Sequence, residues 1–204
     1  MNNFDLIVIG ACHGFWIEND VKKCSNNILL IEPVKYNFDQ LKNRFKNYKN
    51  IIFENIAIGE KNELIDFFHV LESSVDKLKK HWASGIGSFS KDHILKHKTK
   101  RFKITEKDIK CVSVKAITFD ALVKKYKIKY INKLIIDTEG FDYKIIKSIN
   151  FKKIFIKEII FEKKHLNTTF QIDNKLDEIN TLLSKENYKL FDISDENVLA
   201  KKLK

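Results

Sequence analysis

Two glycines bracket a short polar stretch near the start of the chain, in the run IGACHG at residues 9–14. The run follows apolar residues typical of a buried strand, and Gly10 and Gly14 can adopt the backbone conformations of a tight strand-to-helix turn. A dinucleotide fingerprint, GxGxxG, has a middle glycine that lets a pyrophosphate approach the backbone, but this chain has Cys12 there. The spacing therefore favours a nucleoside ligand without a phosphate, although the same turn could belong to another α/β protein.

A carboxylate, Glu32, ends the second apolar run, 32 − 10 = 22 residues after Gly10. An acidic residue about 20 positions beyond a glycine turn of this kind accepts hydrogen bonds from ribose hydroxyls. Glu32 could instead be a solvated carboxylate at a strand end. The glycine turn favours the ribose role, and with it a ligand such as S-adenosylmethionine.

Two more carboxylates follow a later apolar run, in LIIDTEGFDYKII at residues 134–146. Asp137 ends the run directly, and Glu139 comes two residues later. Ligands of open α/β sheets bind outside the carboxyl ends of the strands, so this position favours a role in the site. Glu139 could instead cap the following helix or complement its dipole.

The next strand-like run, IIFEKKH at residues 159–165, ends in Glu162 with His165 close behind. This strand should adjoin the one that ends at Asp137, so both side chains could face that carboxylate across a cleft. Histidine is the usual general base near neutral pH, whereas a lone loop histidine is more often a surface residue. The candidate catalytic residues are Asp137, Glu139 and His165. Glu162 is a candidate substrate contact.

Short apolar runs alternate with amphipathic stretches through most of the chain. Repeated units of this kind predict a doubly wound α/β sheet with right-handed crossovers, and we expect a single domain over residues 1–204. The expected strands cover 4–11, 28–31, 51–58, 64–70, 111–116, 134–137 and 158–161. The expected helices cover 15–24, 34–46, 118–126 and 142–149. Asp173 should cap a last helix, which is followed by a hairpin at 188–193 and 197–201.

The alternation breaks at about residues 60–117, which we expect to form an inserted hairpin with a lid-like segment. Long irregular stretches in compact domains are often lids or binding loops. Aromatic and histidine side chains beside the flexible run SGIGSFS suit a carbohydrate, and His81, Ser88 and His93 are the candidate substrate contacts. A disordered polar loop is the alternative. The aromatic side chains of Trp16, Phe67 and Phe68 are expected in the core.

The composition excludes several classes of protein. Of the 204 residues 44% are hydrophobic, which is enough for a core, and no apolar run approaches the roughly 20 residues that cross a bilayer. The first residues lack the basic region of a secretory signal. Three separate cysteines without a CxxC motif indicate reduced thiols, so a cytoplasmic location is expected. No spacing marks a metal site, and we predict none.

Six segments resemble, in order and spacing, the FkbM family of S-adenosylmethionine-dependent methyltransferases: IGACHG, LLIEP, ENIAIGEKNE, VSVKAITFDAL, LIIDTEGFDYKIIKSI and IIFEKKH. The resemblance covers about residues 6–165, and IIDTEGFDYKIIKSI is its most specific part. It implies a class I, Rossmann-like sheet of seven mostly parallel strands with an antiparallel last strand. It also implies O-methylation of a sugar or another small metabolite. Cys12-His13 departs from the family, in which a small or polar pair is commoner.

The resemblance also implies which residues hold the cofactor, S-adenosylmethionine. Gly10, Ala11 and Gly14 would form the cofactor loop. Glu32 would bind the ribose, and Asp137 would lie beside the sulfonium. The full set of expected cofactor contacts is Ile9, Gly10, Ala11, Cys12, His13, Gly14, Glu32, Pro33, Asn55, Ile56, Ala57 and Asp137, with Asn55 to Ala57 near the adenine. Because the chain begins almost at the first strand, acceptor recognition would fall to the inserted segment or to another subunit, as in a homodimer.

The net charge of +11 is concentrated in one stretch. Residues 91–133 carry 14 Lys and Arg against 4 Asp and Glu, a net +10. Such a cluster could bind the phosphates of RNA, as a nucleic-acid methyltransferase or basic binding module would, but no aromatic stacking motif accompanies it. An anionic small molecule fits the same charge, and a lysine face that contacts only water is a further alternative. Apart from the charge, the fold could have kept its cofactor site and lost its activity. We expect a small-molecule or glycan acceptor.

Overall fold

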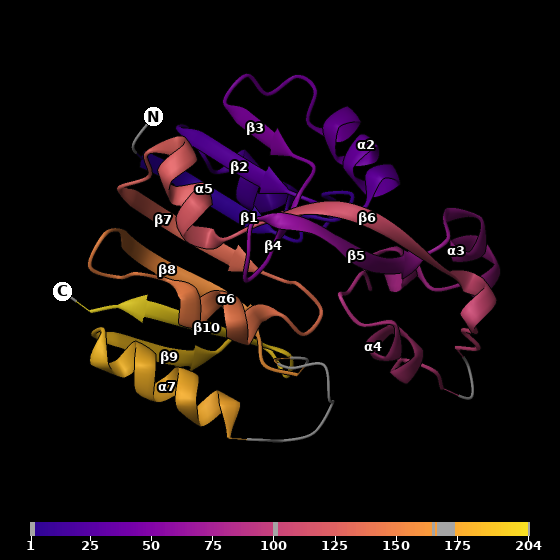
Figure 1. Cartoon of the computed structure of the whole chain (residues 1–204). Coiled ribbons are helices and arrows are strands. Elements are labelled where there is room, and N and C mark those ends of the chain that lie inside the picture. The colour runs from indigo at the N-terminus through magenta and orange to yellow at the C-terminus, as the bar shows by residue number, and fades with distance from the viewer. Residues whose placement is uncertain (1–2, 100–101, 165, 167–173, 204) are drawn as a thin grey trace.

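The computed structural model describes residues 3–99, 102–164, 166 and 174–203. Its centre is a seven-stranded sheet in the order β3-β2-β1-β7-β8-β10-β9 (Figure 1). The strands are β1 (Asn3–Ile9), β2 (Asn27–Ile31), β3 (Ile51–Glu54), β7 (Tyr130–Ile136), β8 (Phe155–Glu162), β9 (Tyr188–Asp192) and β10 (Asn197–Lys202). The first five strands in the order β3 to β8 pair in parallel, and β10 is antiparallel to both of its neighbours. The expected sheet with an antiparallel last strand is confirmed.

Helices cover both faces of this sheet, which explains why its central strands are nearly continuous apolar runs. Side chains of α1 (Glu18–Lys22) and α2 (Lys35–Arg44) pack on one face against Leu6 and Val8 of β1. Side chains of α5 (Phe119–Tyr126), α6 (Asp142–Ser148) and α7 (Lys175–Lys185) pack on the other face against Ile7 and Ile9. Successive residues of β1 therefore belong to opposite cores, as the pleat of a strand requires.

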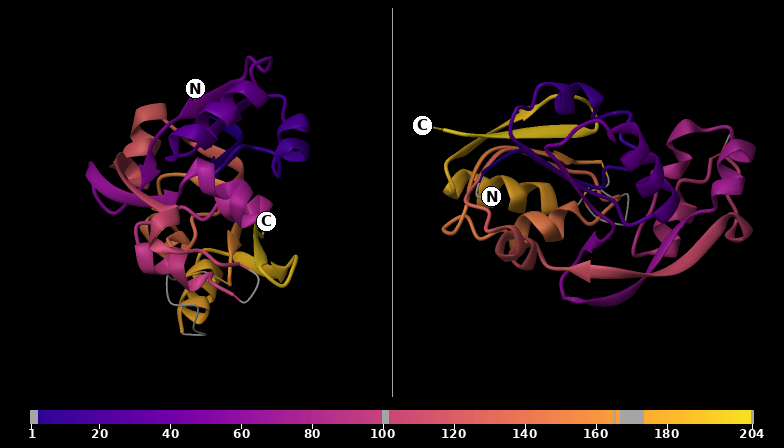
Figure 2. Two further views of the ribbon diagram at one scale, coloured as in Figure 1. Left: turned by 90° about the vertical axis from the view of Figure 1, so that its right-hand side faces the viewer. Right: turned by 90° about the horizontal axis from the view of Figure 1, so that it is seen from above.

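A second, three-stranded sheet is built by residues 57–117, which we call the accessory region. Its strands are β4 (Ala57–Ile58), β5 (Glu63–Val70) and β6 (Ile109–Ile117), in the order β4-β6-β5. Four short helical elements connect β5 to β6: α3 (Glu72–Leu78), η1 (His81–Ser84), α4 (Lys91–Lys96) and η2 (Glu106–Asp108). The long β5 and β6 ribbons run past the main sheet to these helices, which gather at the far end (Figure 2).

The accessory region has a hydrophobic core of its own beneath those helices. Its buried members are Val70, Leu78, Ala83, Ile86, Ile94, Phe102 and Ile104. The sequence predicts an irregular stretch here, whereas the structure forms helices of six and seven residues that pack on this core. Helices this short span fewer than two turns, so they leave too little periodicity to be recognised from the sequence.

Two other expectations differ from the structure. The strand predicted over 51–58 is divided, because Asn55 donates hydrogen bonds from its amide to the carbonyls of Glu32 (2.8 Å) and Pro33 (3.0 Å) and the chain leaves the main sheet there. The helix predicted from residue 15 begins only at Glu18, and Trp16 is 42% exposed rather than in the core. Asp173, the expected cap of the last helix, lies outside the described residues.

Among the residues that the structure describes, no helix is long and apolar enough to cross a membrane. The cysteines, Cys12, Cys24 and Cys111, are three free thiols.

Candidate functional site

A cavity of about 410 Å³ opens at the carboxyl ends of β1, β2 and β7. Its lining residues come from the loops that follow these strands and from the accessory region on the opposite side. They are Ile9, Gly10, Cys12, His13, Phe15, Trp16, Ile31, Glu32, Pro33, Val34, Ile56, Ala57, Ile58, Phe67, Trp82, Ser84, Gly85, Gly87, Phe89, Asp137, Thr138 and Glu139. The volume is in the range of small-molecule sites, and the position is the one where open α/β sheets bind ligands.

The glycine turn after β1 forms one edge of the cavity. Gly10 has φ +87°, and a Cβ on it would lie 1.7 Å from the carbonyl oxygen of Asp137, so only glycine fits. Gly14 has φ +81°, and its Cβ would lie 2.6 Å from the side chains of Leu41 and Phe45. Gly14 and Ala11 are predicted cofactor contacts, but both are buried and neither lines the cavity. The two glycines therefore bring the turn close to β7 on one side and to α2 on the other.

Cys12 and Glu32 connect the ends of β1 and β2. Cys12 has φ +49°, the left-handed conformation that a glycine at this position would adopt at lower cost. Its N–H donates to Oε2 of Glu32 (2.8 Å), and the N–H of Val34 donates to Oε1 (2.8 Å). Glu32 is 4% exposed, and burial raises the pKa of its carboxyl to about 7, against the two backbone hydrogen bonds that lower it. One buried carboxylate thus holds the turn and also lines the cavity.

The structure places the residues predicted near the adenine in two different environments. Ile56 and Ala57 are buried and line the cavity together with Pro33, whereas Asn55 is exposed and lines a different hollow. Asn55 instead fixes the chain that leads to Ile56, through its hydrogen bonds to the carbonyls after β2.

The loop after β7 carries the remaining carboxylates of the wall. The N–H of Asp137 donates to the carbonyl of Ile9 (2.9 Å), so Asp137 is fixed beside the glycine turn. Glu139 has φ +50°, and its Oε2 lies 3.3 Å from Nε2 of His93 and 3.5 Å from Nε2 of His97. The N-cap position of α6 is occupied by Phe141 and not by Glu139.

A buried carboxylate, Asp142, holds this loop in place. Its Oδ2 accepts hydrogen bonds from the N–H (3.0 Å) and the hydroxyl (2.5 Å) of Thr138. Its Oδ1 accepts from the N–H of Glu162 (3.2 Å), and burial raises the pKa of Asp142 to about 7. Glu162 is buried here, 8% exposed, and does not line the cavity.

The other predicted substrate residues come from the accessory region. Ser88 is buried, and its hydroxyl donates to the carbonyl of Glu139 (3.3 Å). His93 is buried on α4 against the Glu139 carboxylate, and His81 belongs to η1. The catalytic candidate His165 lies outside the described residues.

The sequence places Trp82 and Phe89 in the lid-like segment but gives no contact for them, and it does not mark Phe67 as a site residue. Phe67 and Phe89 pack edge to face at 5.3 Å and line the cavity, and Phe89 also packs on Phe141 at 4.8 Å. Trp82 lines the cavity beside the ring of His97, with centroids 6.0 Å apart. His97 was missed, although it follows His93 by four residues and shares its helix face.

Comparison with known proteins decides the family. The sequence profile of the Methyltransferase FkbM domain matches residues 9–190. The chain belongs to the FkbM methyltransferase family. S-adenosylmethionine is the methyl donor of this family, and the cavity fits it in two respects: the Gly10 turn lies close against the end of β7, so Asp137 lines the cavity beside the turn, and a buried carboxylate stands at the end of β2. None of the curated proteins matches the chain significantly in sequence.

Solved structures share the fold at low identity. The fibrillarin pre-rRNA processing protein of Methanococcus jannaschii superposes with a TM-score of 0.50 at 12% identity, over 98% of this chain and 66% of that chain. A Streptococcus mutans protein solved in complex with SAH gives a TM-score of 0.50 at 8% identity, over 100% of this chain and 91% of that chain. At these identities the likeness shows the fold alone.

Proposed function

We propose that this protein transfers the methyl group of S-adenosylmethionine to a hydroxyl oxygen of a sugar or another small metabolite. The observation that carries the proposal is the composition of the cavity at the strand ends: the Gly10 turn and Glu32 lie on its donor side, and Asp137 and Glu139 lie where the accessory region closes it. Carboxylates on a wall that aromatic side chains cover suit a polar acceptor held away from bulk water.

The wall residues suggest how each part of the cofactor is held. Glu32 would accept hydrogen bonds from the ribose hydroxyls, and Ile56 and Ala57 would pack on the adenine. Asp137 would lie beside the sulfonium, because it is fixed against the glycine turn. When bound, the cofactor supplies a methyl group on a positively charged sulfur.

Positioning supplies much of the catalysis of an in-line displacement, and no covalent bond to the enzyme is needed. A sugar hydroxyl is a poor nucleophile, so a group within hydrogen-bond reach must accept its proton. Asp137, Glu139 and the sequence candidate His165 are the groups that we propose for this task. Trp82, Phe67 and Phe89 would exclude water from the acceptor side.

The lysine-rich stretch is the reason to consider an RNA acceptor, but ion pairs use part of its charge. Lys133 pairs with Asp20 (2.8 Å) and Lys125 pairs with Glu54, so carboxylates from outside the stretch offset two of its lysines. The cavity that the accessory region borders has a volume of about 410 Å³, which suits a small molecule better than a polynucleotide.

The donor half of the proposal is tested by thermal-shift and calorimetric titration with S-adenosylmethionine, its demethylated product and NAD. A ligand at 100 times its Kd should stabilise the protein by about 2.7 kcal/mol. We expect both sulfur compounds to do so and NAD to have no effect. Glu32→Gln should weaken binding at least tenfold, and Glu54→Gln, at the end of the neighbouring strand β3 but outside the cavity, should not. Stabilisation by NAD alone would overturn the proposal.

The acceptor half is tested with the radiolabelled methyl donor and two sets of acceptors, nucleotide sugars with phosphorylated glycans, and total RNA. We expect label in a small acceptor, with loss of transfer in Asp137→Asn or in His165→Ala. Label in RNA alone, with steep salt dependence, would replace the proposal by the nucleic-acid function.

A further inference from the structure

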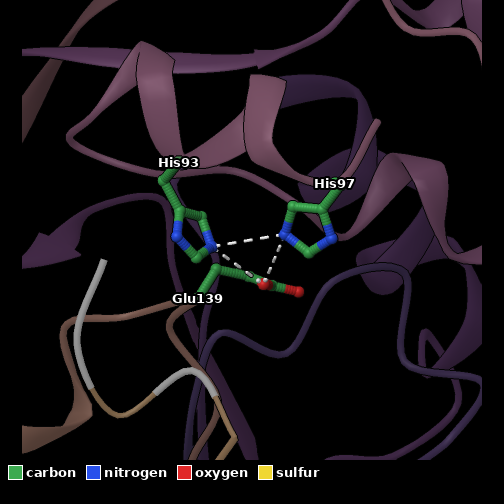
Figure 3. Close-up of side chains that lie close together, drawn as sticks. All are labelled: His93, His97 and Glu139. Atoms are coloured by element: carbon green, nitrogen blue, oxygen red, sulfur yellow. Dashed lines mark hydrogen bonds and ion pairs between the residues drawn. The ribbon is translucent and has the colours of Figure 1, made fainter. Parts of the chain in front are cut away.

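Three metal-binding side chains converge beside the cavity (Figure 3). Nε2 of His93 lies 3.3 Å from Oε2 of Glu139 and 3.4 Å from Nε2 of His97. The third edge, from Nε2 of His97 to Oε2 of Glu139, is 3.5 Å. The three atoms therefore form a nearly equilateral triangle, with one ligand atom from each side chain.

The surrounding structure holds these side chains in this arrangement. His93 and His97 are four residues apart at α4, so both rings project from one face of the helix. The hydroxyl of Ser90 accepts the N–H of His93 at the start of the helix, and Ser88 donates to the carbonyl of Glu139. The His93 side chain is fully buried, and those of His97 and Glu139 are 10% and 17% exposed. Two segments more than 40 residues apart in sequence thus meet at one point.

The spacing is that of three ligands of one ion. Two of the edges, from His93 to Glu139 and from His93 to His97, also meet the geometry of hydrogen bonds, but both are longer than the usual length of about 2.9–3.0 Å. Three ligand atoms bound to one ion at about 2.0–2.1 Å in a tetrahedral arrangement lie about 3.4 Å apart. An octahedral Mg²⁺ site would need shorter edges, of about 3.0 Å, and the larger Ca²⁺ takes oxygen ligands rather than imidazole. The triangle therefore has the size of a tetrahedral site.

We propose that His93, His97 and Glu139 bind a Zn²⁺ ion that has one coordination position open to the cavity. Two imidazoles and one carboxylate are a donor set of catalytic zinc, which keeps its fourth position for water or substrate. Glu139 lines the cavity, and so does Trp82 beside His97, so the ion would border the acceptor side. The site was not expected from the sequence, because His97 was not among its candidates.

The inference rests on the proposed function for its chemical role and deepens it. The open position would take the acceptor hydroxyl, and bound Zn²⁺ would lower the pKa of that hydroxyl, so that its proton passes more readily to Asp137 or His165 near neutral pH. That oxygen then forms a bond to the methyl carbon while the carbon–sulfur bond breaks and leaves its electron pair on the sulfur, which becomes a neutral thioether. Glu139 would act as a ligand and not as the general base.

Metal binding is tested first, without any acceptor. The purified full chain is stripped with a chelator, and Zn²⁺ affinity and stoichiometry are measured by competition with a chromophoric chelator. We expect one tight equivalent, weakened in His97→Gln and in Glu139→Gln by more than the roughly 10–100-fold that loss of a supporting partner costs. The matched controls are Lys98→Gln and Asp92→Asn, two exposed neighbours on the same segment, which should bind as the parent does. Circular dichroism of every variant checks that it is folded.

The geometry and the open position are tested with Co²⁺ in place of Zn²⁺. Four-coordinate Co²⁺ absorbs strongly in the visible, and added azide should shift the spectrum if one position is exchangeable. Absence of Zn²⁺ binding, or binding retained in both ligand variants, would overturn the site. A Co²⁺ spectrum that azide leaves unchanged would overturn the open position. S-adenosylmethionine affinity is measured on the stripped protein in parallel, so failure of the metal site is distinguished from failure of the proposed function.

Discussion

The two sides of the cavity are built differently. On the strand-end side, backbone geometry makes the wall: the turn at Gly10, the left-handed Cys12 and N–H groups directed at one buried carboxylate. On the accessory side, large side chains make it, among them Phe67, Phe89 and Trp82. A wall of backbone atoms changes little when residues are substituted, so the strand-end side suits the methyl donor. A wall of side chains changes with each substitution, so the accessory side should recognise the acceptor.

The two sides also rest on separate cores. Buried residues of β1 and β2 support the strand ends, and the group around Ile94 and Phe102 supports the accessory helices. A further cluster joins the two sides, because Phe67 and Phe89 of the accessory wall pack with Val34 beyond the end of β2. A substitution in either of the first two cores should leave the other side in place. The following predictions test that separation, from the largest effect to the smallest.

Gly10→Ala should have the largest effect. Its Cβ would lie 1.7 Å from a backbone oxygen of Asp137, at a φ that side chains rarely adopt. We expect destabilisation of about 4 kcal/mol or more and no detectable binding of S-adenosylmethionine. Urea denaturation and calorimetry measure both. Gly59→Ala is the control, because its Cβ would lie 3.1 Å from the methyl group of Ala116 and 3.7 Å from the carbonyl oxygen of Lys61. Near-parental stability of Gly10→Ala would contradict this account of the turn.

Asp108→Ala should weaken the accessory side alone. Asp108 is 1% exposed and accepts hydrogen bonds from Ser74, Lys77 and Thr105. We expect a loss of about 2–3 kcal/mol, with S-adenosylmethionine affinity changed less than about threefold. Asp76→Ala, an exposed change on α3, is the control.

Lowering the pH should destabilise the accessory side of the parent protein, as Asp108→Ala does. Burial acts to raise the pKa of Asp108, but the hydrogen bonds from Lys77 and Thr105 outweigh it and lower the pKa below the ordinary 3.8. The stability that ionised Asp108 contributes is therefore fully present above pH 3.8 and is lost as the pH falls below that value. A large fall in cofactor affinity in Asp108→Ala would show that the two sides are coupled.

Cofactor affinity should depend on pH through Glu32. Its pKa is about 7 in the free protein, and ribose hydroxyls, as donors, favour the ionised form, so binding releases a proton. Affinity should be constant above about pH 7 and fall below it by up to roughly tenfold per pH unit. Calorimetry at pH 6 in two buffers of different ionisation enthalpy detects the released proton.

Glu32→Gln should remove this dependence. Burial also raises the pKa of Asp142 to about 7, but Asp142 does not line the cavity. If cofactor affinity still depended on pH in Glu32→Gln, the titrating group would be Asp142 or another residue and not Glu32.

Cys12→Gly should have the smallest effect. Glycine relieves the φ of +49° but gains freedom in the unfolded chain, so stability should change by less than about 1 kcal/mol. Cofactor affinity should be unchanged, because the N–H that Glu32 accepts is retained. Cys12→Val is the comparison, since a β-branched residue tolerates this φ poorly. A large loss of affinity in Cys12→Gly would assign the thiol itself a role.

The strand-end side could be predicted from the sequence, and the accessory side only in part. Apolar runs that end in Gly10, Glu32 and Asp137 are dictated by burial and strand length, and the structure brings these residues to one cavity. The lid-like segment with its aromatic and histidine side chains was expected, but its wall depends on helices of six and seven residues and on pairs such as His93 and Glu139, 46 positions apart. Local patterns do not carry such long-range contacts, so the position of each accessory side chain, and His97 as a neighbour of Glu139, needed the structure to be recognised.

The separate core of the accessory region has an evolutionary consequence. Mutations can accumulate around Trp82, which packs on Phe102 of this core, without a cost to the turn and carboxylate that face the methyl donor. Selection for a new acceptor would therefore act on one side of the cavity while the other is inherited unchanged. A lineage built this way can diversify its products and keep a single donor chemistry.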